Sequence, residues 1–209
     1  MKIRSICSES FGANTYLLIS GTHALVVDPA VSVSAILNAV REEDAYLEGI
    51  LLTHGHFDHM LSLDTLREAT GLGASIHEED AIMLTDGKKN AFYDFFRTER
   101  TFRPAETLLH DRQILSLGDE QITVLHTPGH TGGSVCYLCD GFLVTGDTLF
   151  SEGYGRCDLW SGSTELMQKS LTELRALDGD LTIYPGHGAP ERLRSALNTV
   201  SYLFDLFDF

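Results

Sequence analysis

The segment Thr53-His54-Gly55-His56-Phe57-Asp58-His59 carries four potential metal ligands within six residues. Imidazole nitrogens and carboxylate oxygens are ligands that zinc and similar transition metals accept in proteins. Turns are built mainly from Gly, Pro, Asn, Asp and Ser, so a solvated turn does not explain this density of histidine. The segment therefore predicts a metal site that includes His54, His56, Asp58 and His59.

Three later segments each place a glycine directly before a further potential ligand, at the end of a β-type run. They are Thr127-Pro128-Gly129-His130, Thr145-Gly146-Asp147 and Tyr184-Pro185-Gly186-His187. Glycine has no Cβ, so the backbone can approach an ion closely at these points. The total becomes seven candidate ligands. That number is too large for one zinc ion and suits two metal ions that share a bridging ligand.

Apolar periodicity and glycine positions predict the elements that must hold these ligands. The expected strands span residues 14–20, 24–27, 48–53, 74–77, 122–126, 134–138, 142–145 and 181–184. The expected helices span residues 32–41, 60–70, 78–84, 164–177 and 191–200. All four ligand groups follow strand ends, where α/β folds place their sites. Strands and helices in both halves of the chain predict two sheets with helices outside them.

Two stretches do not fit this pattern. Residues 85–106 lack clear periodicity and combine aromatic with basic side chains, so they form either a lid over a binding site or an irregular arm packed on the core. Residues 202–209 form an apolar tail that docks on the body, pairs between subunits in a homo-oligomer, or stays loose.

The composition narrows the class of protein. The 209 residues suit a single domain, and a net charge of −15 argues against nucleic acid as a partner. No signal peptide is visible, and no apolar run approaches the roughly 18 residues that a membrane span needs. Four scattered cysteines do not suggest a disulfide scaffold. We expect a cytoplasmic protein that acts on a small molecule and does not bind membranes.

Together the motifs resemble the metallo-β-lactamase fold superfamily over nearly the whole chain. The matching segments are Asp28-Pro29, the run from His54 to His59, Pro128-Gly129-His130-Thr131, Gly146-Asp147-Thr148-Leu149-Phe150 and Pro185-Gly186-His187-Gly188. The resemblance implies one α/β domain over residues 1–209, built as a four-layer αββα sandwich of two mixed β-sheets flanked by helices.

The resemblance also implies how the seven ligands are shared between two ions. His54, His56 and His130 would hold the first metal. Asp58, His59 and His187 would hold the second, and Asp147 would bridge the two. The expected ions are divalent, zinc in the first place, with iron or manganese as alternatives.

Within the superfamily the chain is most similar to the small glyoxalase II-like hydrolases. Leu84-Thr85-Asp86 with Asn90, and Gly155-Arg156-Cys157-Asp158, carry this similarity. It implies hydrolysis of a thioester of the hydroxyacylglutathione type, by attack of a metal-bridging hydroxide on the carbonyl, with catalytic roles for Asp58 and Asp147. The chain departs from the branch after Arg156 and lacks the helical C-terminal domain that binds glutathione.

Two alternative functions stay open. A persulfide dioxygenase, which uses one iron, resembles the chain in the histidine run, the Pro-Gly-His segment and the Gly-Arg-x-Asp segment. A non-catalytic metal-binding member is the other alternative, although all seven ligands are present.

The substrate-binding residues are less specific than the ligands. Arg156 either clamps a substrate carboxylate or forms a structural ion pair with Asp158. Tyr154 is a candidate for the pocket wall. We interpret His23, His77, His110 and His126 as ordinary strand or loop residues, with His126 nearest to the site. The pair Cys136 and Cys139 lies on an expected strand and does not suggest a redox or zinc motif.

Overall fold

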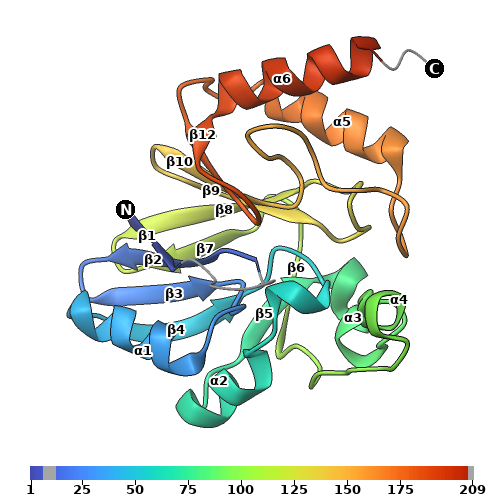
Figure 1. Cartoon of the computed structure of the whole chain (residues 1–209). Helices are drawn as coiled ribbons and strands as arrows, with labels where there is room; N and C mark the ends of the chain where they lie inside the picture. Colours follow the sequence, from blue (N-terminus) through green and yellow to red (C-terminus); the bar gives the residue numbers. More distant parts are fainter. Residues whose placement is uncertain (7–12, 207–209) are drawn as a thin grey trace.

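The computed structural model describes residues 1–6 and 13–206, with side chains described through Ser201. Two six-stranded sheets lie face to face and helices cover their outer faces, which gives four layers (Figure 1). The first sheet contains, in spatial order, β1 (Lys2–Ile6), β2 (Thr15–Ser20), β3 (His23–Val27), β4 (Tyr46–Leu51), β5 (Ala74–His77) and β6 (Thr107–Leu109). The second contains β12 (Glu191–Arg192), β11 (Thr182–Pro185), β10 (Phe142–Gly146), β9 (Val135–Cys139), β8 (Glu120–His126) and β7 (Ile114–Leu117). Both sheets mix parallel and antiparallel pairs, as the family resemblance implies.

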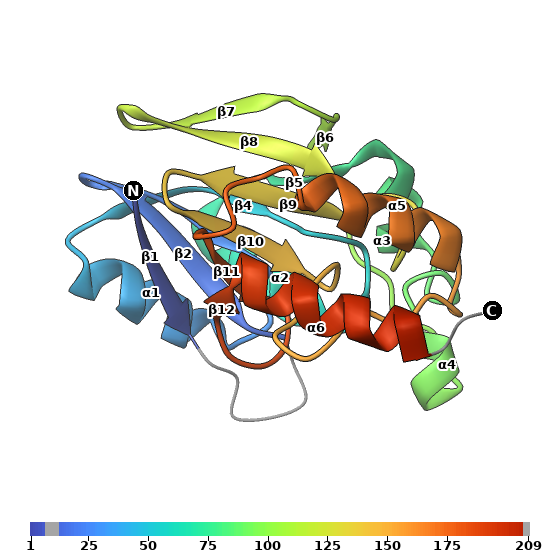
Figure 2. The same ribbon diagram turned by 90° about the horizontal axis from the view of Figure 1, so that it is seen from above.

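The helices divide between the two outer faces. The first sheet carries α1 (Val33–Glu42) and α2 (Leu63–Thr70), and the second carries α5 (Thr164–Leu174) and α6 (Leu193–Leu206) (Figure 1). Seen from above, α5 and α6 lie in front of the strands (Figure 2). Between β5 and β6 the chain forms α3 (Ala81–Thr85) and α4 (Phe92–Phe96). Two short 3-10 turns are η1 (Phe57–His59) and η2 (Glu78–Asp80). No helix within the described residues is long and apolar enough to cross a bilayer.

The alternation of side chains along β2 shows why four layers form. Leu17 and Ile19 belong to the apolar cluster under α1 and α2, whereas Tyr16 and Leu18 belong to the cluster between the two sheets. Successive side chains of a strand point to opposite faces, so a strand that is apolar at every position must be covered on both. A third cluster, between the second sheet and α5 and α6, completes the core.

The topology brings the ends of four strands to one edge. Strands β8 and β10 run in the same direction because both are antiparallel to β9, and β11 is parallel to β10. The carboxyl ends of these three strands therefore lie at the same edge of the second sheet. The carboxyl end of β4 joins them from the first sheet, where the Val135 amide donates to the Thr53 carbonyl at 2.9 Å.

The four edge strands of the two sheets, β1, β6, β7 and β12, are not predicted from the sequence. An edge strand is short and is paired on one side only, so it needs no strong apolar run. The last helix is also longer than expected: α6 continues to Leu206 and includes the first part of the predicted tail. The side chains of residues 202–209, and the whole of 207–209, lie outside the described residues, so the docking of the tail stays a prediction.

Candidate metal centre

The first group of candidate ligands joins both sheets. His54 and His56 follow β4, and His130 follows β8. One nitrogen of each imidazole lies within 4.8 Å of the others, and His56 Nδ1 is 2.8 Å from His130 Nε2. All three side chains are buried. Residues 74 positions apart thus present imidazole nitrogens to one point.

The second group is formed by Asp58 and His59 from η1 and by His187, which follows β11. Asp58 Oδ2 lies 3.3 Å from His187 Nε2. The loop of His187 is fixed by β2 and the residue before it: the Asn14 amide side chain and the Tyr16 hydroxyl both donate to the Pro185 carbonyl, at 3.0 and 2.6 Å.

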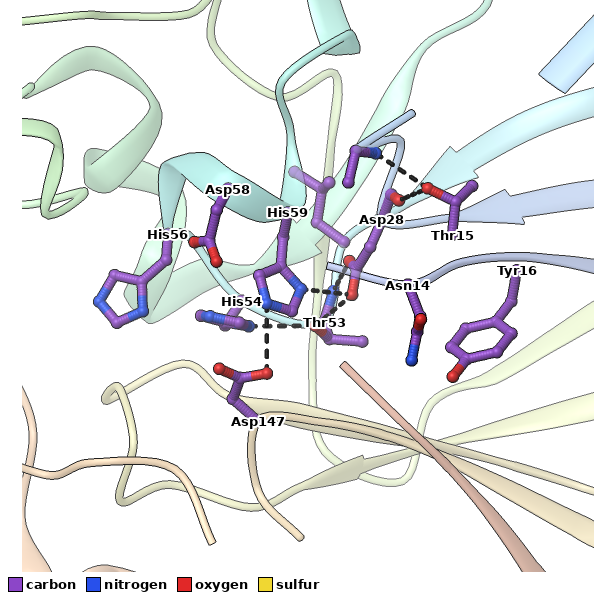
Figure 3. A network of polar contacts seen from close by, with 12 residues as sticks. Asn14, Thr15, Tyr16, Asp28, Thr53, His54, His56, Asp58, His59 and Asp147 are labelled. Carbon is purple, nitrogen blue, oxygen red and sulfur yellow. Dashed lines mark hydrogen bonds and ion pairs between the residues drawn. The ribbon is translucent and has the colours of Figure 1, made fainter. Parts of the chain in front are cut away.

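Asp147 lies between the two groups. Its Oδ1 is 3.2 Å from His59 Nε2 (Figure 3), and its Oδ2 is 3.5 Å from His130 Nε2 and 3.6 Å from His187 Nε2. One carboxylate therefore contacts a histidine of each group. This is the position that a bridging ligand between two ions would take.

Hydrogen bonds on the far side of three imidazoles determine which nitrogen of each ring faces the centre. His59 Nδ1 donates to Asp28 Oδ2 at 2.8 Å, and His130 Nδ1 donates to the Arg156 carbonyl at 2.7 Å. His54 Nδ1 lies 3.1 Å from the hydroxyl of Thr53, which itself donates to Asp28 at 2.7 Å. A neutral ring that donates through Nδ1 keeps its lone pair on Nε2, so each of the three rings turns Nε2 toward the centre.

Among the described residues, the buried Nε2 of His54 has no hydrogen-bond partner. Nε2 of His59 and Oδ1 of Asp147 are also buried and have no hydrogen-bond partner beyond their own contact at 3.2 Å. Leaving buried polar atoms without a partner is costly, and such atoms need an explanation. A metal ion would satisfy them, so the donor set fits two ions of the kind that imidazole and carboxylate bind.

The protonation of these groups supports the same interpretation. Burial lowers the pKa of His54 well below its ordinary value, and burial together with His130 lowers the pKa of His56 to about 3. Both rings are therefore neutral at pH 7, the form that binds metals. Burial alone would lower the pKa of His59, but Asp147 and Asp28 outweigh it and raise that pKa well above normal. The electrostatic potential between His59 and Asp147 thus favours a positive charge.

Two supporting carboxylates were not recognised as such from the sequence. Asp28, with φ of 51°, follows β3 and accepts hydrogen bonds from Thr53 and His59 (Figure 3). Asp80, at the end of η2, accepts from the Gly55 and Gly133 amides at 2.9 and 2.8 Å and from the Thr131 hydroxyl at 2.7 Å. The only signal for Asp28 in the sequence is a lone Asp-Pro after a strand, and Asp80 carries none.

A pocket of about 380 Å³ opens directly on the centre. Arg156 lines this pocket and forms a bidentate ion pair with Asp158, at 2.6 and 2.7 Å. Tyr154 is half-buried against the cluster under α5 and α6 and is not among the residues that line the pocket. The arrangement favours the ion pair among the two roles considered for Arg156, while the backbone carbonyl of the same residue orients His130.

The remaining candidates lie away from the centre. His77, Glu79 and His126 offer ligand atoms within 4.8 Å of one another, but the two rings stack with centroids 4.0 Å apart and planes at 13°, so their lone pairs lie in nearly parallel planes. His126 Nε2 donates to the Gly132 carbonyl at 2.7 Å. Cys136 and Cys139 face opposite sides of β9, in different core clusters. His23 and His110 are exposed and pair with glutamates, and Cys7 lies outside the described residues.

The fold and the centre define a class: an αββα sandwich with a histidine- and aspartate-rich centre at one edge of its two sheets. Comparison with known sequences agrees, because the model of the metallo-beta-lactamase superfamily matches residues 10–187. The chain belongs to that superfamily, whose members bind divalent metal ions.

Individual relatives are similar over nearly their whole length. A protein of Bacillus subtilis named "Probable metallo-hydrolase YqgX" is 34% identical over 191 residues, which is 90% of each chain. The crystal structure of the BLEG-1 B3 metallo-beta-lactamase superimposes with a TM-score of 0.88 at 28% identity, over 97% of this chain and 99% of that one. TTHA1623 in a di-iron-bound form gives a TM-score of 0.84 at 26% identity, over 95% and 99%.

Proposed function

We propose that the protein is a metal-dependent hydrolase that cleaves a small carbonyl compound, with a thioester as the substrate class. One observation carries this proposal: two ligand groups share Asp147 at the floor of a pocket large enough for a small molecule. The relatives named as metallo-hydrolases support the hydrolase part of it. The thioester part rests on the similarity of Gly155-Arg156-Cys157-Asp158 and Asn90 to glyoxalase II-like hydrolases.

In this proposal the seven side chains divide the work. His54, His56 and His130 would hold one ion, and Asp58, His59 and His187 the other. When bound, the two ions would supply a nucleophilic water at neutral pH and polarise a carbonyl. Asp58 lines the pocket, so its carboxylate can accept a hydrogen bond from that water and orient it.

Zinc is the ion we favour, because nitrogen and oxygen donors suit it and it tolerates a thiolate leaving group. Iron is the second candidate, supported by the di-iron-bound form of TTHA1623. We also propose that the substrate is free in solution and not part of a nucleic acid, given the net charge of −15.

A β-lactam is the second candidate substrate, because the structural likeness to BLEG-1 extends over 97% of this chain. The two candidates share an attack on a carbonyl and differ in the leaving group, a thiolate or an amide nitrogen.

The test measures metal content and turnover on the same preparation. The purified protein is loaded with zinc or iron and assayed with lactoylglutathione, an acetyl thioester and a chromogenic β-lactam. His56→Ala and Asp147→Ala should each bind less metal and lose at least about a hundredfold in kcat/KM while staying folded. His23→Ala, an exposed histidine outside the centre, is the matched control and should behave like wild type. Full activity in protein stripped of metal would refute the proposal, and oxygen uptake with glutathione persulfide would point to the dioxygenase instead.

A further inference from the structure

Five of the residues that line the pocket at the metal centre are apolar, and we call them the apolar wall. They come from three separate stretches of the chain and are Phe57, Ala91, Phe95, Phe150 and Leu159. The same pocket is lined by the candidate ligands His56, Asp58, His130, Asp147 and His187. Small-molecule sites commonly combine such a wall with a few converging polar groups. The wall therefore bears on which substituents of a carbonyl compound can enter.

Phe95 is unusual within this wall because 54% of its side chain is exposed. It lies on α4, whose residues Tyr93 and Phe96 are also exposed, by 36% and 47%. Exposed aromatic side chains gathered beside a pocket commonly mark a binding surface. The ring of Phe95 stands 5.7 Å from that of Phe57, which in turn lies between the candidate ligands His56 and Asp58.

Buried Asn90 fixes the position of α4 relative to the metal centre. Its carbonyl accepts from the Phe57 amide at 3.1 Å, and its side chain accepts from the Phe92 amide at 3.1 Å and donates to the Arg100 carbonyl at 2.9 Å. The residues that flank the helix, Ala91 at φ 67° and Arg97 at φ 56°, are both in the left-handed region. Non-glycine residues adopt this conformation only where the surroundings hold them, so α4 is a fixed wall and not a loose arm.

The charges on the pocket wall argue against an anionic substituent on the substrate. Among the described residues that line it, Arg156 is the only lysine or arginine, and both oxygens of Asp158 occupy its guanidinium group. An anionic substituent would thus meet no unpaired arginine or lysine on the pocket wall.

We propose that the pocket selects thioesters whose acyl group carries an apolar, ring-sized substituent, which packs on Phe57 and Phe95 while the thiol carrier extends toward solvent. This inference rests on the proposed thioester hydrolase function and adds the substrate class. Residues 85–106, which the sequence leaves open as a lid or an arm, would then supply the specificity wall.

The test uses metal-loaded protein and three thioesters of one small neutral thiol, N-acetylcysteamine, with acetyl, phenylacetyl and succinyl groups. Wild type should prefer phenylacetyl over both others by about tenfold or more in kcat/KM, since even one methylene in an apolar pocket changes discrimination by ~10-fold. Phe95→Ala should reduce that preference about tenfold, mainly through KM, and Phe95→Leu should restore part of it. Tyr93→Ala changes an exposed ring of the same helix that does not line the pocket, so it should keep the wild-type preference.

A second measurement needs no turnover. Phenylacetate should bind to the metal-loaded protein more tightly than acetate by calorimetry, and Phe95→Ala should remove the difference. If no thioester is hydrolysed but this difference holds, the proposed function fails and the apolar selection stands. Hydrolysis without acyl preference, a preference for the succinyl thioester, or equal binding of the two carboxylates would overturn the inference.

Discussion

Asp28 Oδ2 accepts a hydrogen bond from His59 Nδ1 at 2.8 Å, and neither side chain is more than 1% exposed. The two residues are 31 positions apart, one after β3 and the other in η1. Because the bond fixes the ring of His59, its Nε2 points at Asp147. The same carboxylate accepts from the Thr53 amide and hydroxyl at 2.8 and 2.7 Å, so it also holds the start of the ligand run.

Replacing Asp28 by asparagine should weaken metal binding without removing a ligand. The amide keeps one acceptor oxygen for three donors and turns an NH₂ group toward one of them. Loss of such a supporting bond typically lowers metal affinity by about 10- to 100-fold. Zinc competition against a chromogenic chelator measures the change. Asp44→Asn is the matched control, because Asp44 is an exposed aspartate at a similar φ of 49°; equal affinities in both variants would contradict the role of Asp28.

Gly186 leaves no room for a side chain beside the centre. A Cβ at this position would lie 2.2 Å from Asp147 Oδ1 and 2.6 Å from His59 Cε1. Gly186→Ala should therefore displace the shared carboxylate, lower the metal content by about one ion and reduce turnover by roughly a hundredfold. A Cβ at Gly153 would meet nothing within 4 Å, so Gly153→Ala should bind metal like wild type in elemental analysis. A fully loaded Gly186→Ala protein would disprove the expectation.

Asp80 should contribute mainly to stability. Its buried carboxylate accepts hydrogen bonds from two backbone amides and from the Thr131 hydroxyl. These three donors belong to the loops that carry His56 and His130. Asp80→Ala leaves all three donors without an acceptor, which should lower the free energy of unfolding by about 2–4 kcal/mol. Thr131→Val removes one of the three and should cost about 1 kcal/mol. Urea unfolding compares them, and an Asp80→Ala loss no greater than that of Thr131→Val would argue against this network.

The stacked pair His77 and His126 should make stability depend on pH. Burial and the facing ring lower the pKa of His77 to about 4, from an ordinary value of 6.5. Between pH 6.5 and 4 the unfolded chain binds a proton at His77 that the folded protein does not bind. The contribution of the neutral His77 ring to the free energy of unfolding is therefore complete above pH 6.5 and is lost as the pH falls through about 4. His77→Gln should reduce the loss of stability between pH 7 and 4.5 by about 2 kcal/mol. Urea titrations at both pH values under identical metal conditions test this; parallel losses in the two proteins would exclude His77 as the cause.

The sequence by itself determined the candidate ligands and the central strands. Histidine and aspartate after glycine at strand ends are visible as residue types, and the predicted seven are the residues that the fold brings to one edge. Central strands such as β2 and β10 are recognisable because they are buried on both faces and so are mostly apolar. The predicted two-sheet sandwich followed from these strands and from the resemblance.

The tertiary structure alone decided which residues support the ligands and which line the pocket. Asp28 reaches Thr53 over 25 positions and His59 over 31, and Asp80 reaches Gly133 over 53. These bonds depend on the distance between loops of different strands, and no local pattern encodes that distance. For the same reason only the fold shows that Phe95, in a stretch without periodicity, stands beside Phe57 in the segment of the candidate ligands. The residue types thus predict the chemistry of the centre. The orientation of the candidate ligands and the shape of the pocket depend on contacts between segments far apart in the chain.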